Sequence, residues 1–292
     1  NGTTDIKGMA DISQSAGIEL NGSGAKLITR DFSITNKGLI HIVDGEANFG
    51  NSSGNSVNTS VDGAFVVEGG SVKIAGRLHN SAGGELIAGI PSGISISGGT
   101  VTLATEGNGA SNTGSLNVTQ NGAFNFSNGT TINNTNNPSL QLTGNDLTIS
   151  NQLTMNGGNI DASAQDLIIS NTTASSIAWT SGYVTGNLQR AIAGSGTATY
   201  LSPVGNGNNY TPLELTFNSL SSSGNITVSS INGEHPNIGT SLLNLDKSVN
   251  NYWIVNNSGV TFSSVDGTFE FPLGLADGGD YLAGLYDGSS WS

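Results

Sequence analysis

The stretch LQLTGNDLTISNQLTMNG, residues 140–157, contains three copies of one short pattern. Each copy is an apolar–polar–apolar triplet: Leu140-Gln141-Leu142, Leu147-Thr148-Ile149 and Leu153-Thr154-Met155. Successive side chains of a β-strand point to opposite faces, so each triplet predicts a short strand with one buried face. The residues between the triplets, rich in Gly, Asn and Ser, are typical of turns. The stretch therefore predicts short strands joined by tight turns.

The pattern recurs through much of the first 178 residues, usually after roughly six to nine residues. Strands of three residues are too short for an ordinary β-sandwich, whose strands run about five or six residues. They suit a β-solenoid, in which each coil adds short strands that stack on those of the next coil. Three triplets would make a coil of roughly 20–25 residues. The other copies are Phe65–Val67, Val72–Ile74, Ile94–Ile96, Val101–Leu103, Leu116–Val118, Phe124–Phe126 and Leu167–Ile169.

The use of aromatic residues and cations changes near residue 179. All six tyrosines and all three tryptophans lie at or after this point, beginning with Trp179 and Tyr183. Arg190 is the first Lys or Arg after Arg77. We interpret Arg190 as part of the first strand of a second folded unit rather than as a catalytic group. We therefore predict two all-β domains: a β-solenoid stalk over residues 1–178 and an immunoglobulin-like β-sandwich over residues 179–292.

The second unit is predicted to contain seven longer strands. Their alternating pattern, broken by Gly, Asn and Pro turns, favours an immunoglobulin-like sandwich, with Trp253 as a core anchor. The predicted strands are Tyr183–Arg190, Ala198–Val204, Leu213–Phe217, Asn225–Ile231, Asn250–Val255, Thr268–Phe271 and Tyr281–Tyr286.

The composition excludes several kinds of protein and site. A net charge of −13 with only eight Lys and Arg lacks the basic surface that nucleic-acid binding needs. The absence of cysteine excludes disulfides and cysteine-ligated metal sites. No apolar run approaches the ~20 residues of a membrane-spanning helix. The chain begins at Asn1 without a signal-peptide pattern, so we expect a processed chain or a segment of a longer one.

Five stretches resemble, in order and spacing, a module of large secreted or surface proteins of Bacteroidota-type bacteria. They are GYVTGNLQR (182–190), YLSPVGNGNNYTPLELTF (200–217), NGEHPNIG (232–239), SVNNYWIV (248–255) and LYDGSSWS (285–292). The resemblance covers about residues 180–292. It implies a β-sandwich that follows a Gly/Asn-rich β-helical region, in an adhesin-like repeat protein exported by a type IX pathway. It also implies an extracellular or cell-surface location, and it brings no catalytic residues with it.

An enzymatic alternative is a polysaccharide lyase or hydrolase built on a β-helix. Such enzymes use paired carboxylates, or a carboxylate–calcium site with a basic residue as general base. Asp161 and Asp166 are the candidate acids, but no Lys or Arg lies between Leu78 and Gln189. We therefore interpret both acids as solvated turn or edge residues.

A second charged group surrounds the triplet that ends at Ile74. Lys73, Arg77 and His79 could form a small basic cluster beside Glu68 and Glu85. Charged residues on strand edges also discourage unwanted pairing with other chains, and this interpretation is favoured.

Two further kinds of site involve the second unit. Asp277 and Asp280, with Asp266 and Asp287 nearby, form a weak calcium candidate. Calcium takes six to eight oxygen ligands, so two acids in one loop favour a simple turn. His235 lacks the Cys and His neighbours of a metal site. Tyr210 and Trp291 are candidate aromatic platforms for sugars.

These observations predict a non-catalytic structural or adhesive extracellular protein, a building block of a surface adhesin or extracellular filament. No cofactor, metal or catalytic residue is expected. The expected partners are further copies joined end to end or neighbouring domains of a longer chain, with surface glycans as another candidate. The alternatives are a carbohydrate-binding module of a secreted protein and the β-helix polysaccharide lyase or hydrolase.

Overall fold

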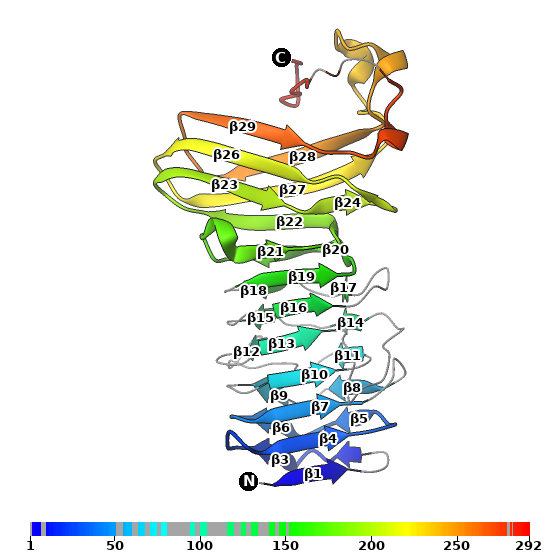
Figure 1. Cartoon of the computed structure of the whole chain (residues 1–292), viewed down its shortest axis with the longest axis vertical. Coiled ribbons are helices and arrows are strands. Elements are labelled where there is room, and N and C mark those ends of the chain that lie inside the picture. The colour runs from blue at the N-terminus through cyan, green and yellow to red at the C-terminus, as the bar shows by residue number, and fades with distance from the viewer. Residues whose placement is uncertain are drawn as a thin grey trace.

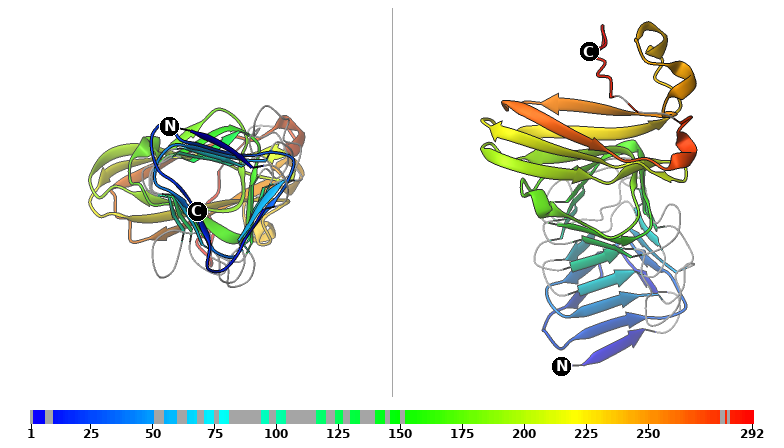
Figure 2. Two further views of the ribbon diagram at one scale, coloured as in Figure 1. Left: turned by 90° about the horizontal axis from the view of Figure 1, so that it is seen from below. Right: turned by 45° about the horizontal axis from the view of Figure 1, so that its top comes forward.

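The chain is all-β and forms a β-solenoid, as the triplet pattern predicted, with strands stacked along one long axis (Figure 1). Viewed along that axis, the coils have a three-sided outline (Figure 2). The structure is a computed structural model that describes residues 2–6, 10–50, 55–59, 64–67, 71–74, 77–80, 94–96, 100–103, 116–119, 124–126, 130–133, 140–143, 146–149, 152–278, 281 and 283–292.

Each side of the solenoid is a parallel β-sheet to which every coil adds one strand. The first side consists of β1 (Thr3–Ile6), β4 (Lys26–Thr29), β7 (Glu46–Phe49), β10 (Ser71–Ile74), β13 (Thr100–Leu103), β16 (Thr130–Asn133), β19 (Leu153–Gly157) and β21 (Ile177–Trp179). The second side contains β2 (Ala10–Ile12), β5 (Ile34–Asn36), β8 (Ser56–Thr59) and β11 (Arg77–Asn80), and above them β14 (Leu116–Thr119) and β17 (Leu140–Thr143). The third side consists of β3 (Gly17–Leu20), β6 (Leu39–Ile42), β9 (Ala64–Val67), β12 (Ile94–Ile96), β15 (Phe124–Phe126), β18 (Leu147–Ile149), β20 (Ile160–Ile169) and β22 (Val184–Ile192).

Aliphatic side chains from successive coils form the solenoid core. On the third side, Leu147 lies opposite Leu167, which lies opposite Leu188, and all three are fully buried. The alternate position between the buried residues of β18 is Thr148, which is partly exposed. Burying a side chain of this size stabilises the fold by about 1.5–3 kcal/mol. The apolar positions of the Leu147–Ile149 triplet therefore face the core, as the alternation predicts.

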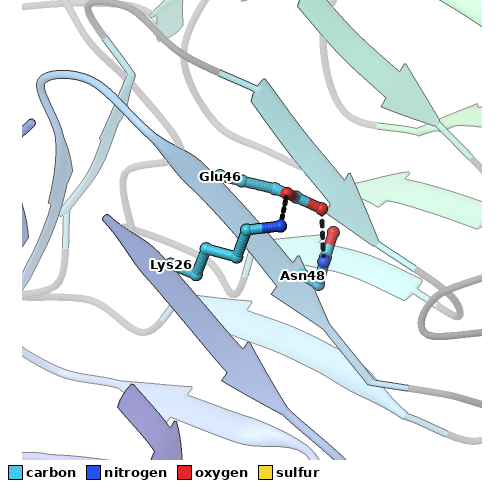
Figure 3. Close-up of polar contacts among 3 residues, drawn as sticks. All are labelled: Lys26, Glu46 and Asn48. Carbon is cyan, nitrogen blue, oxygen red and sulfur yellow. Dashed lines mark hydrogen bonds and ion pairs between the residues drawn. The ribbon is translucent and has the colours of Figure 1, made fainter. Parts of the chain in front are cut away.

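Charged side chains link neighbouring coils on the outer surface. Lys26 of β4 and Glu46 of β7 lie 20 residues apart in the sequence, and the Lys26 Nζ–Glu46 Oε2 distance is 2.6 Å (Figure 3). Glu46 Oε1 also accepts a hydrogen bond from Asn48 Nδ2 at 2.8 Å. The Lys26 and Glu46 side chains are 48% and 28% exposed, and ion pairs in such positions contribute about 0–1 kcal/mol. The separation of 20 residues between Lys26 and Glu46 lies within the predicted coil length. Farther along the chain, Val101 lies opposite Thr130, so the coil between these two residues is longer than predicted.

Two sides of the solenoid merge at its upper end. The start of β20 pairs with β17 on the second side, and its end pairs with β18 on the third. The register shifts between Ala162 and Asp166, and β22 pairs with β20 on both sides of that shift. A Cβ at Gly186 (φ 90°) would lie 2.5 Å from the Ala162 backbone, so this corner requires glycine. Two short strands have thus become one long strand that continues around a corner.

At β22 the pairing becomes mixed: its start pairs in parallel with β24, whereas its end pairs antiparallel with β27, and two layers of three strands form above the solenoid (Figure 1). One layer has the order β22-β27-β28, and the other has the order β23-β26-β29. The new elements are β23 (Gly196–Ser202), β24 (Val204–Asn206), β25 (Asn209–Tyr210), β26 (Leu213–Leu220), β27 (Gly224–Asn232), β28 (Asn251–Ser258) and β29 (Ser264–Phe269). The only helices among the described residues are three-residue 3₁₀ turns, Ala174–Ser176 (η1), Ile238–Thr240 (η2), Leu245–Lys247 (η3) and Leu273–Leu275 (η4), and none is long and apolar enough to cross a membrane.

The structure supports the predicted β architecture of the second unit without confirming an immunoglobulin-like topology. Six of the seven predicted strands have counterparts, with shifted bounds, in β22, β23 and β26–β29. The described residues of the seventh, Tyr281–Tyr286, form no strand, and Tyr286 makes only an isolated bridge to Trp291. The predicted boundary at residues 178 and 179 falls inside β21, whereas the change of pairing occurs at β22. The division into two domains stays a prediction.

Adjacent residues of β4 separate the contributions of the core and the surface. Leu27→Ala should lower the free energy of unfolding by about 2–5 kcal/mol, because Leu27 is buried in the core. Lys26→Ala should lower it by less than about 1 kcal/mol, because its ion pair is exposed. Urea denaturation followed by circular dichroism would measure both variants. Equal losses would show that the outer ion pairs, rather than the aliphatic core, hold the coils together.

Candidate functional site

The candidate catalytic acids lie on different parts of one strand. Asp161 belongs to the start of β20, which pairs with β17, and its Oδ1 accepts a hydrogen bond from Ser163 N at 3.0 Å. Asp166 follows the register shift, and its Oδ1 accepts from Asn187 Nδ2 at 2.9 Å. The Asp166 backbone N–H donates to Asp146 Oδ1 at 2.8 Å. Asp146, Asp166 and Asn187 therefore form a polar ladder across three successive coils.

This ladder differs from the geometry of a general acid–base pair or a metal site. Its carboxylates accept hydrogen bonds from backbone and amide groups of the solenoid itself, so they link neighbouring coils. Within the part of the chain that the structure describes, no three Asp, Glu, His or Cys side chains are grouped so as to hold a metal ion.

The candidate basic cluster is divided between two sides of the solenoid. Lys73 belongs to β10 on the first side, whereas Arg77 and His79 belong to β11 on the second. Glu68 and Glu85 lie outside the described residues. Of the three described residues, only Arg77 and His79 therefore share one side of the solenoid.

The candidate calcium loop is held by other contacts. Asn250 Nδ2 donates to both oxygens of Asp277 at 3.3 Å, and Asn218 Nδ2 donates to Asp266 Oδ2 at 2.9 Å. Asp280 lies outside the described residues. Asp287 accepts hydrogen bonds from the backbone and hydroxyl groups of Ser290 and Ser289. The Ser290 backbone N–H, followed by the Ser289 hydroxyl and backbone N–H, lowers the pKa of Asp287 from 3.8 to about 2.

Tyr210 stacks on another aromatic ring instead of presenting two free faces. Its ring lies parallel to the Trp179 indole, with centroids 4.7 Å apart and an interplanar angle of 8°. Trp179 Nε1 donates to the Gly182 carbonyl at 2.7 Å, and Trp179 remains 37% exposed. Burial, with a smaller contribution from Glu270, raises the pKa of the Tyr210 hydroxyl. The exposed partner in this pair is therefore Trp179, which the sequence analysis did not select as a sugar platform.

Trp291 belongs to an aromatic cluster around His235. The His235 ring centroid lies 5.0 Å from that of Tyr252, 5.0 Å from that of Tyr286 and 5.1 Å from that of Trp291. Trp291 Nε1 donates to the Asn237 carbonyl at 3.0 Å. These contacts attach the last residues of the chain to the 235–237 loop. His235 thus serves as a packing centre, a role that its isolated position in the sequence did not indicate.

Arg190 has the most unusual environment of the sequence-selected residues. Its side chain is only 1% exposed. It donates hydrogen bonds to the carbonyls of Leu201 and Ala174 and to Ser176 Oγ. Its guanidinium carbon lies 5.0 Å from the centroid of the Tyr200 ring. Arg190 therefore joins β22, the η1 turn and β23 at the junction between the solenoid and the antiparallel layers.

Neutral acceptors replace an acidic partner around this guanidinium. Burial lowers the pKa of Arg190 from 12.5 to about 10, and the Tyr200 hydroxyl acts in the opposite direction. The side chain is still charged at neutral pH, so the carbonyl dipoles must offset much of its desolvation cost. Tyr200 extends the network, because its hydroxyl donates to the Thr172 carbonyl at 2.8 Å and accepts from Ala193 N at 3.0 Å. The sequence analysis placed Arg190 on the correct strand but missed its burial.

No family model matches the chain, and neither a curated protein nor a solved structure does. The function proposed below is therefore argued from the fold, the contacts and the sequence resemblance.

Substitution of Arg190 tests the junction. Arg190→Ala should lower the free energy of unfolding by about 3–5 kcal/mol, because it leaves a cavity and unpaired buried carbonyls. Arg190→Lys should also be destabilising, since one ammonium group cannot replace a planar fork that reaches both η1 and β23. Gln189→Ala, at the neighbouring outward position, is the matched control. Urea denaturation would measure all three, and full stability of Arg190→Lys would show that charge alone is sufficient.

The Asp287 turn should weaken in acid. The folded pKa of about 2 lies below the ordinary value of 3.8, so this carboxylate stabilises the folded turn above about pH 4. That stabilisation should be lost as the pH falls through about 2. NMR titration of the Ser289 and Ser290 amides should show this midpoint, and Asp287→Asn should abolish it. A midpoint near 4 would contradict the hydrogen-bonded geometry.

Proposed function

We propose that this chain is a non-catalytic structural or adhesive protein that works outside the cell, as a building block of a surface adhesin or an extracellular filament. The observation that carries the proposal is the parallel strand ladder, which runs from β1 to β21 on one side and reaches β22 on another. Strands in such a ladder lie across the long axis, so their backbone hydrogen bonds run along it. A rod of this kind transmits mechanical force between its ends and needs no catalytic site to do so.

The charge distribution supports a mechanical role for the rod. Three described carboxylates of the solenoid form cross-coil links: Glu46 with Lys26, Asp5 with Arg30, and Asp146 with the Asp166 backbone. Such links help to keep the coils in register and place polar groups on the outer faces of the sheets. They contribute alignment more than stability.

The antiparallel layers act as the cap of the rod in this proposal. A solenoid end exposes unpaired backbone groups, and terminal capping elements are needed to keep such folds soluble. The stretch GYVTGNLQR, which carries part of the resemblance to Bacteroidota-type surface proteins, includes Gly186 of the corner and Arg190 of the junction. The resemblance thus includes residues that join a rod to its cap. An immunoglobulin-like sandwich and a cell-surface location are the finer parts of this proposal.

Carbohydrate binding is a second candidate, favoured by the exposed Trp179 ring. An indole backed by a stacked Tyr210 ring is rigid, and flat aromatic surfaces of this kind suit the apolar faces of sugars. Trp179→Ala should abolish glycan-array binding if the pair is a sugar platform. Trp291→Ala tests the other predicted platform in the same assay.

The structural role is tested by location, shape and lack of turnover. Antibody against the purified chain should label intact source cells or their extracellular material, and electron microscopy of the chain should show short rods. Beads coated with the chain should be retained on a surface under flow. Labelling of permeabilised cells alone would contradict the proposal. Polysaccharide cleavage that disappears in both Asp161→Asn and Asp166→Asn would show an enzyme instead.

A further inference from the structure

Among the described residues, the two antiparallel layers each end, on the side away from the solenoid, at a strand with one unpaired edge. The back layer ends at β28, which pairs with β27, and the front layer ends at β29, which pairs with β26. Figure 1 shows these two strands side by side at the far end of the two layers. The Trp253 and Phe269 rings meet across them with centroids 5.0 Å apart. We call the surface between β28 and β29 the distal rim.

Side chains that point toward the core lie exposed at this rim. Val255 lies opposite Val228, which is fully buried, so both face the space between the layers. Val265 and Phe269 likewise lie opposite the buried Phe217 and Leu213. Yet Val255, Val265 and Phe269 remain 43%, 40% and 38% exposed. The core therefore extends to the rim, and no further strand among the residues that the structure describes pairs with β28 or β29 there.

The described end of the chain does not supply that strand. Residues 285–292 pair with one another, through the reciprocal hydrogen bonds of Leu285 and Ser292. Trp291 packs this segment against the loop that contains His235 and Asn237. The segment Tyr281–Tyr286, predicted as the seventh strand, joins neither layer in its described residues.

The sequence of β28 favours pairing with another strand. Its residues, NYWIVNNS, include no charged side chain and no proline. Proteins that keep an edge strand unpaired normally protect it with charged residues, proline or a bulge. β28 has neither a charged residue nor a proline. The rim carries few charges: Asp266 is the one charged residue of β29, and it accepts a hydrogen bond from Asn218.

We propose that the distal rim is a dimer interface, in which β28 pairs antiparallel with β28 of a second copy about a twofold axis. A twofold axis brings identical strands together in antiparallel orientation, so the same edge satisfies both copies. Each layer would continue into the partner, and the exposed Val255, Val265 and Phe269 of both copies would form one core. This inference rests on the proposed structural function and specifies one of its contacts.

The opposite end of the rod fits this rim less well. It presents three strands, β1, β2 and β3, around a triangle, whereas the rim presents two layers. Asp5 and Arg30 also form a charged pair next to the β1 edge. The second copy therefore docks by the same rim rather than head to tail.

Sedimentation equilibrium of the 292-residue chain tests the interface. The parent chain should form a dimer that does not grow into longer polymers as the concentration rises. Ile254→Lys places a charge on the outward face of β28 and should weaken dimerisation at least tenfold, while circular dichroism remains unchanged. Leu242→Lys makes the same change at a fully exposed leucine elsewhere and should dimerise like the parent.

Cysteine cross-linking provides a second readout, because the chain contains no cysteine. A single cysteine at Ile254 or Asn256 should yield a disulfide-linked dimer under mild oxidation, whereas Leu242→Cys should not. A monomeric parent at millimolar concentration, open-ended polymers, or equal behaviour of the two lysine variants would overturn the proposal. If antibody labels the cell surface but the chain sediments as a monomer, the dimer interface alone is overturned. If the chain is a dimer but is found only inside cells, the surface function is overturned.

Discussion

The fold depends on one constraint: every coil must return its apolar positions to the same place above the preceding coil. Parallel pairing sets the spacing of the backbones, and the register then decides which side chains meet in the core. The ranks Leu147–Leu167–Leu188 and Leu153–Ile177 show the result, since each member is almost completely buried. The turns between them tolerate different lengths as long as this alignment is kept, which explains why coils of unequal length stack in one ladder.

A stacked solenoid becomes a two-layered cap through a local change at its last coils. At the corner, β20 and β22 each continue from the second side to the third, so that two sides of the triangle join into one sheet. Arg190 then holds the η1 turn and β23 against β22 by hydrogen bonds to main-chain carbonyls. Main-chain acceptors keep their positions whatever the surrounding side chains are, so a planar guanidinium with several donors suits this junction. The cation that returns in the sequence marks this change in architecture.

The sequence predicted the solenoid because the signal is local. The triplet Leu140–Leu142, for example, shows the apolar–polar–apolar alternation and also forms a strand, since it lies within β17. The long strand β20 was not predicted, because Ser163, Ala164 and Gln165 break the alternation and only pairing with neighbouring coils extends the strand. The burial of Arg190 was equally hidden, since its acceptors are carbonyls that any residue carries. Tyr281–Tyr286 alternates like a strand but lacks a neighbouring strand among its described contacts.

The double pairing of β22 also bears on the order in which the chain folds. The parallel contacts of β22 with β20 join residues 21–24 positions apart in the sequence, whereas its antiparallel contacts with β27 join residues 32–40 positions apart. Shorter loops close at a lower entropic cost, so the coil contacts between β20 and β22 can form before the antiparallel pairing of the cap. Coil stacking is thus the local part of this fold, whereas the cap closes longer loops between more distant parts of the chain.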